Sequence, residues 1–135
     1  MKNLKTIIEI KKKHKFFLVL IQPKIKCSTK EIYSGVKNFS AKENFNKKLI
    51  KSKNTFLDYL KKSRNDLQFV VERKYPLIKK LLKDINNEKG CNFSRLTGSG
   101  SVCYGLFRDQ VFAKKALNKL KNKYPKFWFS LAKTI

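Results

Sequence analysis

Residues that cross-link a chain or bind metal are scarce in this sequence. It contains three cysteines, Cys27, Cys91 and Cys103, and one histidine. An odd number of widely separated cysteines with no C-x-x-C pair argues against a disulfide framework, and one histidine offers little to a zinc site. We therefore expect no metal ligands, and we expect the thiols to be structural in a reducing compartment.

Glycine and proline are also scarce, and no long hydrophobic run is present. The 135 residues include five glycines and three prolines, which excludes collagen-like and low-complexity chains. The apolar run Phe16–Ile21 is too short to span a bilayer, and no small-residue cleavage site follows it. These features predict a cytoplasmic protein with no membrane partner.

Acidic residues are few. Nine Asp and Glu stand against 33 Lys and Arg, so the net charge is +24. Hydrophobic residues make up 41% of the chain, which excludes a disordered basic tail and predicts one globular domain. The basic residues are spread along the sequence and four of them are arginine, whereas nucleic-acid-binding proteins gather charge on one face and favour arginine. A genome rich in A and T explains the lysines, and we expect no nucleic-acid partner.

Apolar patterns and helix caps predict an α+β domain. Phe16–Ile21 is continuously apolar, as in a buried strand. Ser28 and Glu31 have the spacing of a capping box, which predicts a helix over about 29–38. In chain order the expected elements are a strand at 16–21, helices at 29–38, near Leu57 and Leu60, after Asn65 and from Pro76, strands at 92–96 and 102–107, a helix after Asp109 and a strand at 127–131. This order predicts a mainly antiparallel sheet of about four strands with helices on one face.

The strongest local signal is a glycine-rich segment between two expected strands. It comprises Thr97, Gly98, Ser99, Gly100 and Ser101. Glycine admits a positive φ and lets the backbone approach an anion, and the hydroxyls add donors. The same residues suit a tight hairpin that needs glycine only to turn, and the spacing leaves both interpretations open. A Walker phosphate loop is excluded because the segment lacks its lysine and a strand follows it.

Several segments together resemble one kinase family. They are Phe16–Gln22, Ser28–Tyr33, Asn65–Leu67, Tyr75–Ile78, Ser94–Phe107 and Phe127–Lys133. Their order and approximate spacing are similar to the C-terminal half of the 4-diphosphocytidyl-2-C-methyl-D-erythritol kinases, of the GHMP kinase superfamily. The resemblance implies the ferredoxin-like fold of a GHMP kinase C-terminal domain over residues 16–135. Residues 1–15 would then be a basic strand or turn left over from the N-terminal domain.

The resemblance also implies roles for individual residues. These kinases use ATP and Mg²⁺ to phosphorylate 4-(cytidine 5'-diphospho)-2-C-methyl-D-erythritol in non-mevalonate isoprenoid biosynthesis. Thr29 matches a position near this cytidine-diphosphate-bearing substrate, and Tyr33 matches an aromatic residue that stacks on the cytosine ring. Residues 97–101 match the glycine-rich third motif beside the phosphoryl-transfer centre. Asn65 and Asp66 match the family's Asn-Asp pair, for which we expect a helix-capping role.

Tyr33 and one acidic pair elsewhere in the sequence have simple structural explanations. From the residues alone, Tyr33 fits equally well on the core face of its helix beside Ile32 and Val36. Asp84 and Glu88 are spaced as neighbours on a helix, and we interpret them as an exposed pair that relieves a basic helix end.

The family's phosphate loop and its catalytic aspartate and lysine lie in an N-terminal half that this sequence does not match. We therefore assign no catalytic residue. The chain is expected to be a C-terminal fragment or one half of a split protein, inactive alone, whose N-terminal partner half provides the main site for ATP and Mg²⁺.

Two alternatives from other functional classes remain. One is a basic RNA-binding α+β module, because Tyr104–Phe107 is faintly similar to the aromatic strand of an RRM. Against it, Val102 and Cys103 stand where that motif has a basic residue and a glycine. The other alternative is a non-catalytic partner domain that completes another chain.

Overall fold

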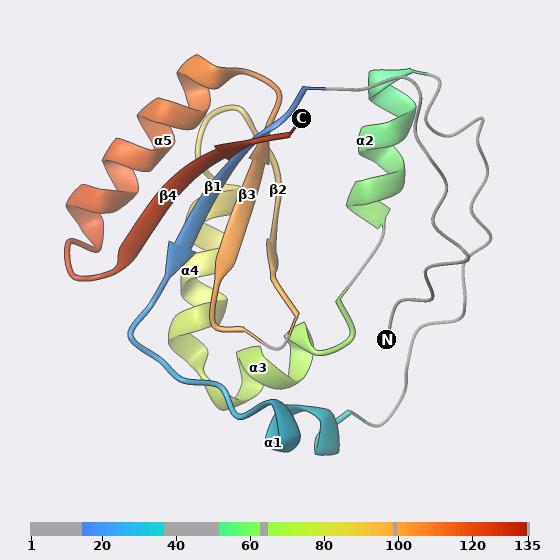
Figure 1. The fold of residues 1–135 in the computed structure, drawn as a ribbon, viewed down its shortest axis with the longest axis vertical. Coiled ribbons are helices and arrows are strands. Elements are labelled where there is room, and N and C mark those ends of the chain that lie inside the picture. Colours follow the sequence, from blue (N-terminus) through green and yellow to red (C-terminus); the bar gives the residue numbers. More distant parts are fainter. Residues whose placement is uncertain (1–14, 37–51, 63–64, 99, 135) are drawn as a thin grey trace.

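A computed structural model of the chain describes residues 15–36, 52–62, 65–98 and 100–134. This part contains nine helices and strands (Figure 1). They are β1 (Phe17–Gln22), α1 (Thr29–Ser34), α2 (Lys53–Lys62), α3 (Gln68–Lys74), α4 (Pro76–Asn86), β2 (Cys91–Leu96), β3 (Cys103–Phe107), α5 (Gln110–Lys123) and β4 (Trp128–Lys133). The expectation for residues 1–15 lies outside the described residues except for Lys15, as do Ser99 and the end of the helix expected over 29–38.

The four strands form one antiparallel sheet in the order β2-β3-β1-β4. β1 is central, and its residue Val19 lies opposite Gly105 of β3 and Leu131 of β4. The first strand in the sequence thus pairs with the last. The expected antiparallel α+β sheet is confirmed, and each predicted strand forms within two residues of its expected bounds.

One face of the sheet carries the main core. Val19 and Ile21 of β1 and Phe107 of β3 are fully buried there. The helix α4 packs against them because its apolar residues recur at helical spacing and form one stripe. These residues are Ile78, Leu81, Leu82 and Ile85. α5 covers the neighbouring part of the same face with Ala113, Ala116 and Leu120.

The opposite face of the sheet holds a smaller core that belongs to α2. Leu57 of α2 packs with Phe93 of β2, Leu106 of β3 and Phe16. Successive strand residues point to opposite faces, so these side chains lie across the sheet from the main core. The fold therefore has helices α4 and α5 as one layer, and the short α2 adds a partial cover on the other side.

The ends of the helices follow the predicted caps with one exception. The side chains of Ser28 and Asp109 accept hydrogen bonds from the backbone N–H groups of Glu31 and Val111, and Pro76 occupies the first turn of α4. The exception is Asn65, which precedes α3 by three residues. The N-cap of α3 is Leu67, whose side chain makes no capping bond, and the Asn65 side chain instead accepts from Leu67 N–H at 2.9 Å.

Within the described ranges, no helix combines the length and the apolar character needed to cross a membrane.

Candidate functional site

The glycine-rich loop joins β2 to β3 as a tight hairpin. The backbone N–H and the hydroxyl of Thr97 both donate to the Val102 carbonyl, at 2.9 and 3.0 Å. Gly100 N–H donates to the Thr97 carbonyl at 2.9 Å. Gly98 and Gly100 have φ values of +48° and +90°, a region that residues with a side chain rarely adopt. The segment therefore forms the tight hairpin turn that its glycines allow, and the Thr97 hydroxyl is engaged inside the turn.

The two glycines face different surroundings. Apart from its chain neighbours, no atom of the described residues lies within 4 Å of the point where a Cβ of Gly98 would stand, which leaves space for an anion on this side of the backbone. A Cβ on Gly100 would instead lie 3.1 Å from Cys27 Sγ. Ser101, the next residue, is buried. The loop therefore has one open side at Gly98 and one packed side at Gly100.

The packed side of the loop touches the segment that leads into α1. Cys27 is two residues before Thr29, the first residue of α1. Burial raises the pKa of the Cys27 thiol, and the nearby Lys74 partly opposes this increase. Figure 1 shows α1, α3 and the turn between β2 and β3 at the same end of the sheet. The structure thus brings the glycine-rich loop close to the start of the helix that carries Thr29 and Tyr33.

Thr29 and Tyr33 both lie on the surface of α1. Tyr33 is 53% exposed, and Ile32 is the buried residue of this helix. The alternative in which Tyr33 faces the core is therefore wrong. Its ring is accessible to a partner from solvent.

The residues just before and within α3 hold the loop from the other side. The Asn65 side chain donates to the carbonyls of Leu96 and Gly98, at 2.9 and 2.6 Å. Gln68 accepts a hydrogen bond from Leu96 N–H at 2.9 Å. Asp66, the other member of the Asn-Asp pair, follows Asn65 in the sequence, and it is half-buried. Gln68 was not among the residues predicted from the sequence, where its only signal is an amide three residues after Asn65.

A shallow hollow of about 280 Å³ adjoins these residues. Its lining consists of Lys61, Lys62, Asn65, Gln68, Phe69, Glu72, Ser94 and Arg95. Arg95 donates to the carbonyls of Leu60 and Lys61 at the end of α2, so this arginine is committed to the fold. The hollow is basic, and it borders the loop through Asn65.

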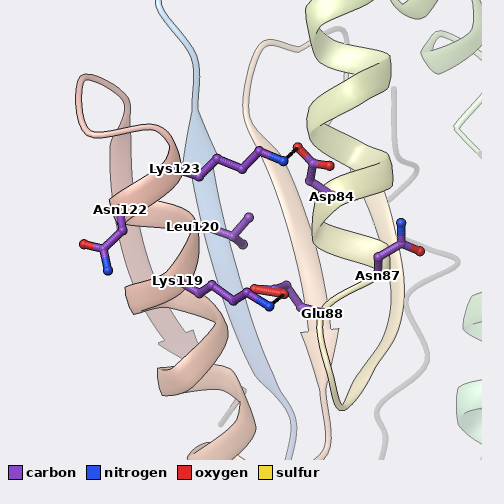
Figure 2. A pocket seen from close by; sticks show the side chains of 7 residues that line it. All are labelled: Asp84, Asn87, Glu88, Lys119, Leu120, Asn122 and Lys123. Atoms are coloured by element: carbon purple, nitrogen blue, oxygen red, sulfur yellow. Dashed lines mark ion pairs between the residues drawn. The ribbon is translucent and has the colours of Figure 1, made fainter.

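A larger groove of about 470 Å³ runs between α4 and α5 (Figure 2). Two ion pairs span it, Lys123 with Asp84 at 3.0 Å and Lys119 with Glu88 at 3.6 Å. Asp84 and Glu88 were expected to be exposed, but both are half-buried. This groove lies at the C-terminal end of α4, near the start of β2. The glycine-rich loop follows the other end of β2. Its charges cancel in pairs, so it lacks the uncompensated charge that would attract an ionic ligand.

Metal ligands do not cluster in the described part of the chain. No three His, Cys, Asp or Glu side chains there are close enough to share an ion. Burial raises the pKa of Cys91 to about 11 and that of Cys103 to about 12, so both thiols stay protonated at neutral pH. The described residues therefore do not fit a Mg²⁺ site.

Comparison with known proteins gives a family match. Residues 41–126 match the family model described as GHMP kinases C terminal. The 4-diphosphocytidyl-2-C-methyl-D-erythritol kinase of Pelagibacter ubique is 38% identical over 132 residues, which are 96% of this chain and 45% of that protein. The kinase of the same name from Caldanaerobacter subterraneus is 34% identical over 123 residues, 87% of this chain and 41% of that protein.

Solved structures give the same fold. A crystal structure of 4-(cytidine 5'-diphospho)-2C-methyl-D-erythritol kinase aligns with a TM-score of 0.65 and 18% identity, covering 87% of this chain and 42% of that one. Homoserine kinase from Cytophaga hutchinsonii aligns with a TM-score of 0.51 and 13% identity, covering 89% and 41%. At these identities the structures support the fold alone. The chain spans less than half the length of these relatives.

Proposed function

The chain belongs to the family of GHMP kinase C-terminal domains, and from this premise we propose that it is the C-terminal part of an ATP-dependent kinase for 4-(cytidine 5'-diphospho)-2-C-methyl-D-erythritol. The substrate class comes from the names of the relatives, which cover nearly the whole chain. In this proposal the chain forms the substrate-side wall of the site, and the N-terminal half of the kinase holds ATP and Mg²⁺.

One contact carries the proposal. Gly100 packs against Cys27, so the glycine-rich loop and the start of α1 border the same region of the surface. A substrate with a cytidine diphosphate at one end and a reacting hydroxyl at the other needs two such walls. Tyr33 can receive the base, and the open backbone at Gly98 can border the phosphates.

The proposed division of work follows the chemistry of phosphoryl transfer, which depends mainly on positioning and on neutralising charge. ATP and Mg²⁺, when bound, supply the phosphoryl group and part of that neutralisation. This chain's contribution is to orient the substrate. The exposed ring of Tyr33 offers a stacking surface to cytosine, and stacking of a base on an aromatic side chain is worth about 1–3 kcal/mol.

The experiment is a chimera with the Pelagibacter ubique relative, in which this chain replaces the matching C-terminal part. We expect ATP-dependent phosphorylation of 4-(cytidine 5'-diphospho)-2-C-methyl-D-erythritol. The substitution Tyr33→Leu should raise KM for this substrate about tenfold or more because the stacking energy is lost. Tyr33→Phe keeps the ring and should change KM little.

Two controls make the result decisive. The relative's own two halves, cut at the same position and rejoined, show that the junction permits activity. Trp128→Leu removes another half-exposed aromatic ring, on β4, and should leave KM unchanged. If the chimera folds but shows no turnover, while the relative's own rejoined halves are active, the proposal is refuted.

The RNA-binding alternative loses support from one observation. Tyr104, the sheet aromatic on which it depends, packs edge-on against Phe93 with ring centroids 6.2 Å apart. The two rings belong to the small core beneath α2. A base therefore has no open aromatic platform at this position, in contrast to an RRM sheet.

A further inference from the structure

The glycine-rich loop depends on side chains from outside its own hairpin. Within the described part of the turn, hydrogen bonds join Thr97 to Val102 and Gly100 to Thr97. Among the described residues β2 is an edge strand of the sheet, so in this part of the chain no further strand lies beside Leu96 to bind its outward-facing backbone groups. Such groups need partners when they are half-buried or buried.

Asn65 and Gln68 provide these partners. Asn65 Nδ2 donates to the Leu96 carbonyl at 2.9 Å, and Gln68 Oε1 accepts from the Leu96 N–H at 2.9 Å. The two amides thus bind both backbone polar groups of a single residue, as a neighbouring strand would. Asn65 Nδ2 also donates to the Gly98 carbonyl at 2.6 Å, which extends the contact into the loop.

The orientation of the Asn65 amide is fixed by the backbone of Leu67, two residues along the chain. Asn65 Oδ1 accepts from Leu67 N–H at 2.9 Å, so the amide nitrogen must point toward the loop. This arrangement requires one acceptor and two donor hydrogens on the same planar group. Among common side chains of this length, asparagine alone carries both.

The helix α3 also holds α1. Lys74 of α3 pairs with Glu31 of α1. A Cβ on Gly35, the C-cap of α1, would lie 2.8 Å from Val70 Cγ1, so the two helices are in close contact. α3 therefore touches both the loop and the helix that carries Tyr33.

From these contacts we propose that Asn65 is a positioning residue, which sets the glycine-rich loop relative to α1 through α3, with Gln68 as its second anchor. The inference rests on the proposed kinase function for its consequence, since the loop and α1 are the two walls of that site. The pair of amides from Asn65 and Gln68 that binds the loop, here called the clamp, is a property of this chain alone. It acts through the position of Gly98 and not by contact with the substrate.

The test uses two substitutions that are matched in size and charge. Asn65→Asp keeps the acceptor for Leu67 N–H but loses both donors and places a carboxylate against two carbonyls. Gln68→Glu keeps the acceptor that Leu96 N–H uses. Both variants replace an amide by a carboxylate, so they differ in whether the hydrogen bonds to the loop survive.

The first measurement is amide hydrogen exchange on the full 135-residue chain. In Asn65→Asp, exchange at Thr97 and Gly100 should become about tenfold faster or more, because a lost hydrogen bond with an unpaired buried group costs about 1–3 kcal/mol. In Gln68→Glu, the amides of Thr97 and Gly100 should exchange at the rates of the parent.

A second variant separates a local effect from general unfolding. If Asn65→Asp accelerates exchange throughout α5 as well, Gln68→Leu provides the local test, since it should accelerate exchange of the Leu96 amide and leave exchange in α5 unchanged. Parent-like exchange of the loop in Asn65→Asp overturns the clamp.

The second measurement is kinetic, in the chimeric kinase. Asn65→Asp should lower kcat about tenfold while KM for the cytidine substrate changes less than about threefold. Gln68→Glu should retain both constants. Equal kinetics in the two variants overturn the positioning role. An inactive parent chimera with a normal exchange response refutes the kinase proposal and leaves the clamp standing, so the two failures are distinguishable.

Discussion

The side chain of Tyr124 connects two helices through one carboxylate. Its hydroxyl donates to Asp84 of α4, which also pairs with Lys123 at 3.0 Å. Burial by itself would raise the pKa of Asp84, but the bonds from Tyr124 and Lys123 lower it below its ordinary value. Burial and the same carboxylate raise the pKa of Tyr124 to about 12. The bond between the helices thus depends on a charged Asp84 and a protonated Tyr124.

We expect Tyr124→Phe to reduce the free energy of unfolding by about 1 kcal/mol at pH 7, because a hydrogen bond to a carboxylate is lost. The lowered pKa of Asp84 means that its contribution is complete above its ordinary value and disappears as pH falls through the folded value. The raised pKa of Tyr124 means that its contribution is complete below about pH 10 and is lost toward pH 12. The difference between the variant and the parent should therefore be constant from about pH 5 to 9 and shrink outside this window.

Urea denaturation across pH measures this difference. Tyr75→Phe is the matched control, because the Tyr75 hydroxyl makes an exposed bond of 3.3 Å to the Lys26 carbonyl and its loss should cost little at any pH. A Tyr124→Phe effect that persists unchanged at pH 2 would contradict the explanation.

Residue roles that depend on neighbours in sequence were predictable. Ser28 and Asp109 cap helices a few positions away, and Pro76 opens α4. Asn65 was expected to be a helix cap, but its amide binds carbonyls 31 and 33 positions along the chain. No local pattern encodes such a partner, because it depends on how α3 and the β2–β3 hairpin meet.

At the scale of elements, α4 sits close to the sheet because β3 contains a glycine. A Cβ on Gly105 would overlap Ile85 Cγ2 of α4 and stand 3.3 Å from Cys91 Sγ. Gly105 is buried in the centre of β3. The absence of a side chain therefore sets the distance between this helix and the sheet.

We expect Gly105→Ala to destabilise the chain by about 1–3 kcal/mol, the usual cost of overpacking a core. In an Ile85→Ala background the methyl group has space, so the same substitution should cost clearly less than in the parent. Thermal unfolding of the four variants of this cycle gives the coupling. Strict additivity would show that Ile85 is not the obstacle.

The existence and order of the elements were predictable, but their placement in layers was less so. The strands and α4 follow apolar patterns that are visible in the sequence. α2 was predicted from Leu57 and Leu60, and both now belong to the small core on the second face of the sheet. An amphipathic stripe predicts that a helix buries one side, but it does not predict against which face of a sheet the helix packs.

The whole molecule carries far more positive than negative charge. Its net charge is +24, and the described residues show ion pairs at Glu31, Asp84 and Glu88. Exposed pairs contribute little to stability. Repulsion among the remaining lysines therefore opposes the compact state.

We expect the melting temperature to rise when ionic strength increases from about 0.01 to 0.15 M, because the Debye length falls from about 30 to 8 Å. Circular dichroism at two salt concentrations measures this change. Replacing Lys114 and Lys115, both exposed on α5, by glutamate should raise the melting temperature at low salt and reduce the gain from added salt. A melting temperature that falls with salt would mean that attractive pairs outweigh the repulsion.

The position of β1 has a consequence for how the protein is made. β1 lies between β3 and β4, and Phe16 at its start exchanges hydrogen bonds with Thr134, whose hydroxyl accepts at 2.8 Å and whose N–H donates at 2.9 Å. During synthesis, β1 leaves the ribosome before both of its neighbours, and the second of them, β4, begins only at Trp128. Chains dominated by such distant pairings fold slowly and expose unpaired strand edges meanwhile. The nascent chain therefore exposes β1 as an apolar strand without its partners until β3 and β4 have been made, and a chaperone would bind it during this interval.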